Sequence, residues 1–203
     1  MSQPKVWFIT GASRGIGAEI VKAALAAGDR VVATGRNRDQ IAASFKEHSE
    51  RLLPVELDVT RELHAFAAVE TAVARFGRID VLVNNAGYAY RAEIGALDLG
   101  KMRAMFDVNV FGLVDLTNRV VPLLREQQEG DIINIASTSG MKGNAGGTAY
   151  SGSKWAVRGI TQCWQAELRP HGIRVVCVCP SEVQTEFGGR TGRNNPNKLY
   201  AED

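Results

Sequence analysis

Short apolar runs alternate with amphipathic segments along the chain. Most of these runs are continuous rather than alternating in polarity, and they span residues 5–10, 30–35, 52–59, 79–87, 130–137 and 173–181. A continuous apolar run of this length is typical of a strand that is covered on both faces, and such strands are usually parallel. The pattern therefore predicts an α/β fold in which six β-α repeats form a doubly wound parallel sheet with helices on both faces. No linker interrupts the repeats, so we expect one domain over residues 1–203.

The segments between the runs carry the spacing of amphipathic helices. Before the fourth run, apolar side chains recur at steps of three and four residues at Leu63, Phe66, Val69, Val73 and Phe76. Thr60 stands where an N-cap is expected, and Gly77 stands where the helix should end.

A longer helix is predicted over about residues 101–128, with two irregularities. Asn109 begins the sequence Asn-Val-Phe-Gly, and Pro122 lies further along. The Asn side chain competes for backbone hydrogen bonds, and Pro removes one, so either position can bend the helix. A kink at Asn109 would leave a backbone carbonyl group exposed.

The composition changes after Ser181. The remaining residues include several glycines and asparagines and almost nothing apolar. From about residue 186 we therefore expect a flexible lid or tail.

Charge and cysteine content exclude several classes of protein. The net charge is +2, and the basic residues are scattered, which argues against binding nucleic acid. No apolar run approaches the ~18 residues of a membrane span, and a signal-peptide pattern is absent, so we expect a cytoplasmic protein. Cys163, Cys177 and Cys179 lack metal-ligand or redox spacing, which predicts buried thiols in a reducing compartment and no metal site.

The sequence Thr-Gly-Ala-Ser-Arg-Gly-Ile-Gly occupies residues 10–17, between the first predicted strand and the first predicted helix. Glycines at this position let the backbone approach a pyrophosphate, whose charge the helix N-terminus favours. The spacing differs from the Gly-x-Gly-x-x-Gly dinucleotide motif, so this loop alone could equally be a plain glycine-rich turn.

Further motifs follow in order: Asn-Asn-Ala-Gly at 84–87, Asn109, Ser137, and Tyr150-x-x-x-Lys154. Together with the glycine loop they closely resemble the short-chain dehydrogenase/reductase family, the NAD(P)H-dependent oxidoreductases with one Rossmann domain. The family pattern Thr-Gly-x-x-x-Gly-x-Gly accounts for the spacing of the glycines. The resemblance extends from residue 5 to about residue 187. It implies the strand order 3-2-1-4-5-6, with the family's usual last strand missing.

Tyr150 and Lys154 are four residues apart, so on a helix they share one face. A free tyrosine has a pKa of about 10, and a nearby ammonium group favours the phenolate, which makes Tyr150 a candidate general acid/base. Ser137 ends the fifth run and should lie at the mouth of the sheet, where its hydroxyl group could hold the substrate oxygen. Ser139 competes for this role, but the family pattern Ser-x-x-Gly selects Ser137. The resemblance further implies that the backbone carbonyl of Asn109 anchors a water that relays protons to Lys154.

The resemblance also implies a set of cofactor-binding residues. Asp58 would touch the adenine ring or cap a helix, or do both, and the segment from Pro180 to Thr185 would hold the nicotinamide carboxamide. Ser181 stands where the family has glycine, which puts the geometry of that loop in doubt. The complete set is Gly11, Ser13, Arg14, Gly15, Ile16, Gly17, Arg36, Asp58, Val59, Asn85, Ala86, Gly87, Tyr150, Lys154, Pro180, Val183 and Thr185.

The end of the second run predicts which nicotinamide cofactor is used. Enzymes that choose NAD usually place an acidic residue there to bind the ribose 2′-hydroxyl group, whereas this chain has Gly35 followed by Arg36. Arg14 and Arg36 belong to separate loops that should reach the same end of the cofactor. Guanidinium groups bind phosphate well through paired hydrogen bonds. We therefore expect NADP(H), although both arginines could also be merely solvated.

These observations predict an NADPH-dependent oxidoreductase that reduces a ketone or an aldehyde to an alcohol. A catalytically silent NADP-binding regulatory or scaffold protein of the same fold is the alternative. The substrate cannot be read from the sequence. Tyr88 and Tyr90 suggest a partly apolar pocket and Arg91 could meet an acidic group, although ordinary packing or solvation accounts for each equally simply. By resemblance, we expect a homodimer or homotetramer formed through helices 101–128 and 150–169.

Overall fold

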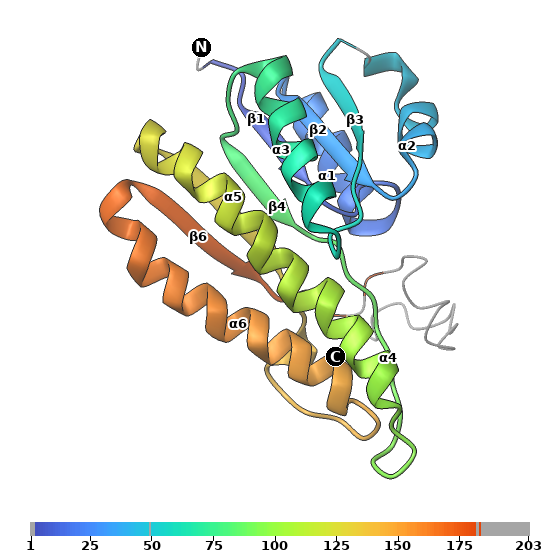
Figure 1. The fold of residues 1–203 in the computed structure, drawn as a ribbon. Helices are drawn as coiled ribbons and strands as arrows, with labels where there is room; N and C mark the ends of the chain where they lie inside the picture. The colour runs from blue at the N-terminus through green and yellow to red at the C-terminus, as the bar shows by residue number, and fades with distance from the viewer. Residues whose placement is uncertain (1–2, 49, 182, 184–203) are drawn as a thin grey trace, which may run out of the picture.

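The computed structural model describes residues 3–48, 50–181 and 183 of the 203-residue chain. Six parallel strands form one sheet in the order β3-β2-β1-β4-β5-β6, as predicted (Figure 1). Each strand lies within one of the six apolar runs. The strands are β1 (Val6–Ile9), β2 (Arg30–Gly35), β3 (Leu52–Glu56), β4 (Val81–Asn84), β5 (Gly130–Ile135) and β6 (Ile173–Val178).

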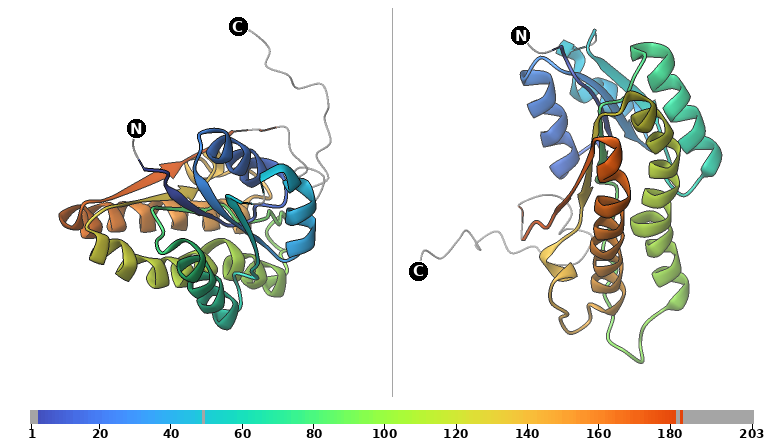
Figure 2. Two further views of the ribbon diagram at one scale, coloured as in Figure 1. Left: turned by 90° about the horizontal axis from the view of Figure 1, so that it is seen from above. Right: turned by 90° about the vertical axis from the view of Figure 1, so that its left-hand side faces the viewer.

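Helices cover both faces of the sheet (Figure 2). On one face lie α1 (Gly15–Ala26) and the short α2 (Arg38–Ser44), and on the other lie α3 (Glu62–Phe76), α5 (Gly112–Gln127) and α6 (Thr148–Leu168). Single 3-10 turns occur at η1 (Lys46–His48), η3 (Thr138–Gly140) and η4 (Arg169–His171). None of the helices in the described part of the chain has the length and apolar character that crossing a membrane requires.

The continuous apolar character of the strands reflects two separate cores. Phe8 packs with Leu116 and Val120 beneath α5, whereas the next residue, Ile9, packs with Val21 beneath α1. Successive side chains of a strand point to opposite faces, so a strand with a core on each face needs apolar residues at every position.

Helix α3 buries a different set of side chains from the one that its large apolar residues suggest. Leu63 and Phe66 are 78% and 55% exposed, because the buried face consists mainly of Ala65, Ala68, Val69, Ala72 and Phe76. The helix ends at Gly77, which adopts the left-handed conformation (φ 78°), as predicted. The prediction for Thr60 was wrong. The N-cap is Arg61, and the Thr60 hydroxyl instead donates a hydrogen bond to the Asp58 carboxylate.

The long helix predicted over residues 101–128 is continuous but irregular. α4 (Leu99–Phe106) leads into a π-helical segment, η2 (Asp107–Phe111), and then into α5. Asn109 lies in the middle of η2, where the sequence predicts an irregularity. Pro122 is accommodated inside α5 without ending it. π-Helical segments inside α-helices occur frequently at functional sites.

A buried row of polar side chains crosses the middle of the sheet. Asn84 in β4 donates from Nδ2 to Asn134 Oδ1 in β5 (2.9 Å) and to Thr117 Oγ1 in α5 (3.0 Å). Asn134 donates in turn to Thr161 Oγ1 in α6 (2.9 Å). The row therefore connects the neighbouring strands β4 and β5 to α5 and α6.

Strand β6 lies at the edge of the sheet. Its Val176 and Val178 side chains are 37% and 41% exposed, whereas Ile173 and Val175 are buried. The expected lid or tail from about residue 186 lies outside the described residues.

Gly112 lets α5 lie directly against the segment that follows β3. A Cβ atom at this position would lie 2.5 Å from the carbonyl oxygen of Val59 and 2.9 Å from the Cβ atom of Val59. These distances are shorter than any van der Waals contact, so a larger residue would displace the helix or the loop.

We therefore predict that Gly112→Ala destabilises the protein by about 1–3 kcal/mol, because the added methyl group overpacks this contact. Thermal unfolding followed by circular dichroism measures the effect as a lower Tm. The matched control is Gly159→Ala in α6, where a Cβ atom would meet nothing within 4 Å. That change should be neutral or stabilising by up to ~1 kcal/mol, since alanine favours a helix. Equal effects of the two substitutions would contradict the packing argument.

Candidate active site

Ser137, Tyr150 and Lys154 come together at the carboxyl end of β5. Ser137 lies two residues after the end of this strand and caps η3, where its Oγ accepts a hydrogen bond from the Ser139 backbone N–H (3.1 Å). Tyr150 and Lys154 lie one turn apart in α6 and are 7% and 5% exposed. The hydroxyl groups of Ser137 and Tyr150 are hydrogen-bonded to each other. Ser137 therefore contacts the tyrosine, whereas Ser139 contributes only its backbone here.

The environment of Tyr150 raises the pKa of its phenol group. Burial is the largest cause, and the hydrogen bond with Ser137 and the charge of Arg91 oppose it without cancelling it. The sequence-based argument assigned the opposing charge to Lys154. In the structure, the Lys154 Nζ atom lies 5.9 Å from the centroid of the Tyr150 ring, and the Arg91 guanidinium carbon lies 5.7 Å from it. The protonated phenol is thus the favoured form without cofactor.

Lys154 is held in place by the sheet. Its Nζ atom donates a hydrogen bond to the carbonyl oxygen of Ile135 (2.8 Å). Burial lowers the pKa of Lys154 to about 8, against smaller opposing contributions from Cys177 and Cys179. Desolvation disfavours the ammonium form, so Lys154 gives up its proton far more easily than a surface lysine does.

Asn109 connects η2 to the loop after β4. Its Oδ1 atom accepts a hydrogen bond from the Tyr88 backbone N–H (3.0 Å), and its Nδ2 atom donates to the Tyr88 carbonyl oxygen (2.9 Å) and to Ser153 Oγ (3.1 Å). The side chain is almost completely buried. A Cβ atom on Gly87 would lie 3.0 Å from Asn109 Oδ1 and 3.7 Å from Lys154 Nζ, so this glycine keeps the two segments in close contact.

The glycine loop is fitted closely against the end of β4. Gly11 has a φ of 64°, and a Cβ atom there would lie 3.0 Å from the Cα atom of Ala86. A Cβ atom on Gly17 would overlap the carbonyl oxygen of Gly11. The Asn85 Nδ2 atom donates to the carbonyl oxygens of Thr10 (2.9 Å) and Gly11 (3.1 Å). The glycines therefore let this loop, which includes Ser13 and Ile16, lie directly against the end of β4 at the start of α1.

Thr10 is a positioning residue in this region that the sequence-based set omits. Its Oγ1 atom accepts hydrogen bonds from the backbone N–H groups of Asn85 and Ala86, both at 2.9 Å, and donates to Val83 (3.1 Å). The first threonine of the glycine motif was the available signal. Its side chain fixes the position of the glycine loop relative to the segment that follows β4.

Arg14 and Arg36 extend from neighbouring segments at one end of the site. Arg14 is the N-cap residue of α1, and both arginines are exposed. The two segments are close because Ala12 donates its backbone N–H to Thr34 (2.9 Å) and because a Cβ atom on Gly35 would lie 3.9 Å from the Cβ atom of Ser13.

Asp58 lies near this end and forms a local turn. Its Oδ1 atom accepts hydrogen bonds from the backbone N–H (3.0 Å) and the hydroxyl group (2.7 Å) of Thr60. Burial raises the pKa of Asp58, but the Thr60 hydrogen bonds and the charges of Arg36 and His64 outweigh it, so the net shift is downward. Asp58 therefore carries a negative charge next to Arg36, and Val59 follows it in contact with α5.

The expected carboxamide segment is only partly described. The Pro180 carbonyl oxygen accepts a hydrogen bond from the Thr138 backbone N–H (3.0 Å), which ties this segment to the residue after Ser137. Among the described residues outside glycine, only Gln128 has a positive φ, so Ser181 adopts ordinary backbone geometry without glycine. Val183 is 50% exposed, and Thr185 lies outside the described residues.

The cysteines are less buried than predicted. Cys177 and Cys179 are half-buried, with their Sγ atoms 3.8 Å apart. Cys163 is exposed rather than buried, because it occupies the solvent side of α6.

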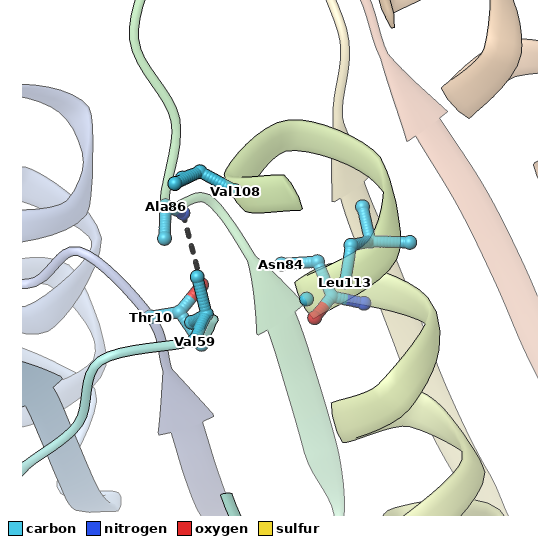
Figure 3. Close-up of a pocket in the computed structure, with 7 residues that line it drawn as sticks. Thr10, Val59, Asn84, Ala86, Val108 and Leu113 are labelled. Atoms are coloured by element: carbon cyan, nitrogen blue, oxygen red, sulfur yellow. Dashed lines mark hydrogen bonds between the residues drawn. The ribbon is translucent and has the colours of Figure 1, made fainter. Parts of the chain in front are cut away.

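A narrow crevice is lined in part by Asn84 of the polar row (Figure 3). It is too narrow to hold a water molecule, and neither Tyr150 nor Lys154 lines it. Asn84 Oδ1, which is buried without a hydrogen-bond partner among the described residues, belongs to its wall. We therefore regard the crevice as a packing feature. Its lining residues are Thr10, Val59, Asn84, Ala86, Val108, Gly112 and Leu113.

Comparison with known proteins identifies the relatives of this chain. An oxidoreductase named BOA17 from Botryotinia fuckeliana is 39% identical over 186 residues, which cover 91% of this chain and 68% of that protein. A 3-alpha-(or 20-beta)-hydroxysteroid dehydrogenase from Mycobacterium tuberculosis is 38% identical over 89% of this chain and 70% of its own length. This chain thus spans about two thirds of the length of both relatives.

Two solved structures share the fold. A 3-ketoacyl-(acyl-carrier-protein) reductase from Brucella melitensis in complex with NADH has a TM-score of 0.88 and 31% identity, over 92% of this chain and 79% of that one. ElxO with NADP bound has a TM-score of 0.87 and 28% identity, over 93% of this chain and 77% of that one. The family model for short chain dehydrogenases matches residues 5–196. With this match over almost the whole chain, with relatives near 40% identity and with the parallel six-stranded sheet, the chain belongs to the short-chain dehydrogenase family of oxidoreductases.

Proposed function

We propose that this protein is an NADPH-dependent oxidoreductase that reduces a ketone or an aldehyde to an alcohol. The observation that carries the proposal is the buried contact between Ser137 and Tyr150, with the Lys154 ammonium group in the next turn of α6. A protonated phenol and a serine hydroxyl group on one side of the site suit a carbonyl oxygen that gains negative charge during reduction.

Each residue has a separate role in this proposal. Tyr150 donates the proton to the carbonyl oxygen, and its raised pKa keeps that proton available at neutral pH. Ser137 orients the same oxygen by a hydrogen bond. Lys154 takes up and releases a proton easily because its pKa is about 8, so it can return a proton to Tyr150. Asn109, in the π-helical segment beside Lys154, would hold the water that supplies that proton through its backbone carbonyl.

The glycine loop with Gly11, Gly15 and Gly17 at the N-terminus of α1 supports cofactor binding there, and the bound nicotinamide would supply the hydride. The two structural neighbours contain NADH in one case and NADP in the other, so the family leaves the choice open. We propose NADP(H), because the exposed Arg14 and Arg36 extend from neighbouring segments, where they could pair with a 2′-phosphate, and no carboxylate occupies position 35. The Asp58 carboxylate already accepts a hydrogen bond from the Thr60 hydroxyl group.

We further propose a homodimer or homotetramer formed through the helices of residues 101–128 and 150–169. Phe111 and Trp155 on these helices are 61% and 50% exposed, which suits a contact with a second copy.

Tyr150→Phe is predicted to lower kcat for NADPH-dependent ketone reduction by at least about 100-fold, because it removes the proton donor and leaves the ring in place. The affinity for NADPH, measured by its fluorescence, should stay unchanged. Tyr90→Phe is the matched control, since the Tyr90 hydroxyl group only accepts a hydrogen bond from the Asp98 backbone N–H. Substantial activity in Tyr150→Phe would refute the assigned role. A wild-type chain that binds NADPH but reduces no carbonyl compound would instead support the catalytically silent alternative.

Arg36→Ala is predicted to raise the KM for NADPH by about 10- to 100-fold and to leave the KM for NADH nearly unchanged, since the charged contact exists only with the 2′-phosphate. Steady-state kinetics with both cofactors measures the change. Arg125→Ala serves as the control, because it removes the same charge from the last turn of α5, outside the proposed cofactor site. An unaltered cofactor preference in Arg36→Ala would contradict the choice of NADP(H).

We also expect Lys154 to titrate with a pKa of about 8 in the cofactor-free protein. Burial disfavours the ammonium form, so the side chain is charged below this pH and neutral above it. NMR titration of protein labelled at the lysine Cε atoms measures this directly, and the resonance should vanish in Lys154→Arg. The prediction fails if every lysine titrates near the ordinary value of about 10.4.

A further inference from the structure

Arg91 is a cation beside Tyr150 that the proposed reaction does not use. Its guanidinium carbon lies 5.7 Å from the centroid of the Tyr150 ring, and its charge acts on the phenol. The side chain is half-buried. Arg91 belongs to the loop between β4 and α4, which lies beside the loop that leads into α6 (Figure 1).

The loop that carries Arg91 is held firmly on both sides. The Tyr90 backbone N–H donates to Met105 Sδ (3.3 Å), and the Tyr90 hydroxyl group accepts a hydrogen bond from the Asp98 backbone N–H (3.0 Å). On the other side, the Ala92 backbone N–H donates to the carbonyl oxygen of Gly146 (3.1 Å). Arg91 is thus presented by a fixed backbone, which reduces the entropy lost when a ligand binds.

Apolar side chains surround the Tyr150 ring that Arg91 faces. Tyr88, Ala89, Leu97 and Phe106 pack against the cluster that contains Tyr150. Within the residues that the structure describes, the Arg91 guanidinium group lies over this ring and makes neither a hydrogen bond nor an ion pair. The N–H groups of this guanidinium are available to an anion. A carboxylate suits them best, because guanidinium can bind it through two parallel hydrogen bonds.

We propose that Arg91 binds a carboxylate of the substrate, so that the preferred substrates are short oxo acids rather than neutral ketones or aldehydes. The inference rests on the proposed function, in which Tyr150 and Ser137 bind the carbonyl oxygen. Arg91 and Tyr150 are neighbours in the fold. The carboxylate bound by Arg91 and the carbonyl group bound by Tyr150 must therefore lie close together in one small molecule. The ion pair would orient that molecule and add selectivity that the apolar walls cannot provide.

Paired substrates that differ in charge test the proposal. We compare kcat/KM for pyruvate, acetoacetate and levulinate with kcat/KM for their ethyl esters, using NADPH. The wild type should prefer at least one acid over its ester. Arg91→Gln should lower kcat/KM for that acid by about 10- to 100-fold and change the ester little, because only the acid loses a charged hydrogen bond. Arg91→Lys should retain part of the preference, since it keeps the charge but not the planar fork.

Lys101→Gln is the matched control. It removes a positive charge from the same region, but its Nζ atom lies 5.9 Å from the centroid of the Tyr90 ring and it is not part of the proposed site. It should leave the acid-to-ester ratio unchanged. If Arg91→Gln lowers the rates for acid and ester equally, Arg91 only supports the Tyr150 ring and the proposal is wrong. A wild type that prefers every ester also overturns it.

A binding measurement separates this inference from the proposed reaction. β-Hydroxybutyrate cannot react when NADPH is the bound cofactor, so calorimetry reports its affinity without turnover. We expect Arg91→Gln to weaken this binding at least about tenfold and Lys101→Gln to leave it unchanged. Equal affinities in the wild type and Arg91→Gln would overturn the carboxylate site. Binding that depends on Arg91 without reduction of any ketone would retain the site and reject the reaction.

Discussion

The buried polar row through Asn84 and Asn134 is the constraint on which the arrangement of the site depends. Unsatisfied amide groups are costly in a dry interior, so the two strands and the helices above them must align for the hydrogen bonds to form. Thr117 fixes α5 and Thr161 fixes α6 relative to the same two strands. Apolar packing alone would allow each helix to slide or rotate. The row removes that freedom and brings α6, with Tyr150 and Lys154, to the end of β5.

The same low-dielectric interior sets the protonation of the site. Burial raises the pKa of Tyr150 and lowers the pKa of Lys154 to about 8. At neutral pH the phenol is therefore protonated, and Lys154 is still an ammonium group but close to its titration. The positive charge of Arg91 acts on the same phenol. A proton donor beside this cation suits the reduction of a carbonyl group and, at the proposed carboxylate site, an anionic substrate. A substrate carboxylate paired with Arg91 would also weaken the one cationic influence that lowers the pKa of Tyr150.

The cofactor region depends on close contacts between backbones more than on side chains. Gly11, Gly17 and Gly87 each lie where a Cβ atom would touch or overlap a neighbouring segment. Gly112 does the same on the opposite face of the sheet, where it seats the start of α5 beside Val59. These contacts hold the glycine loop, the end of β4 and the π-helical segment close together. In the proposed cofactor complex, the exposed Arg14 and Arg36 would pair with a phosphate group of the cofactor.

The sequence by itself determined the strands, their order and the family, because apolar runs and ordered motifs are local features that survive without coordinates. It also located the irregularity at Asn109, since an asparagine inside a helix weakens the local hydrogen bonds. Tertiary structure alone decided which face of α3 is buried, since small alanines fit against the sheet where Leu63 and Phe66 do not. It also decided that the Tyr150 ring faces Arg91 as well as Lys154. Arg91 lies 59 positions before Tyr150 in the chain, and only the packing of the two loops brings its charge to the ring.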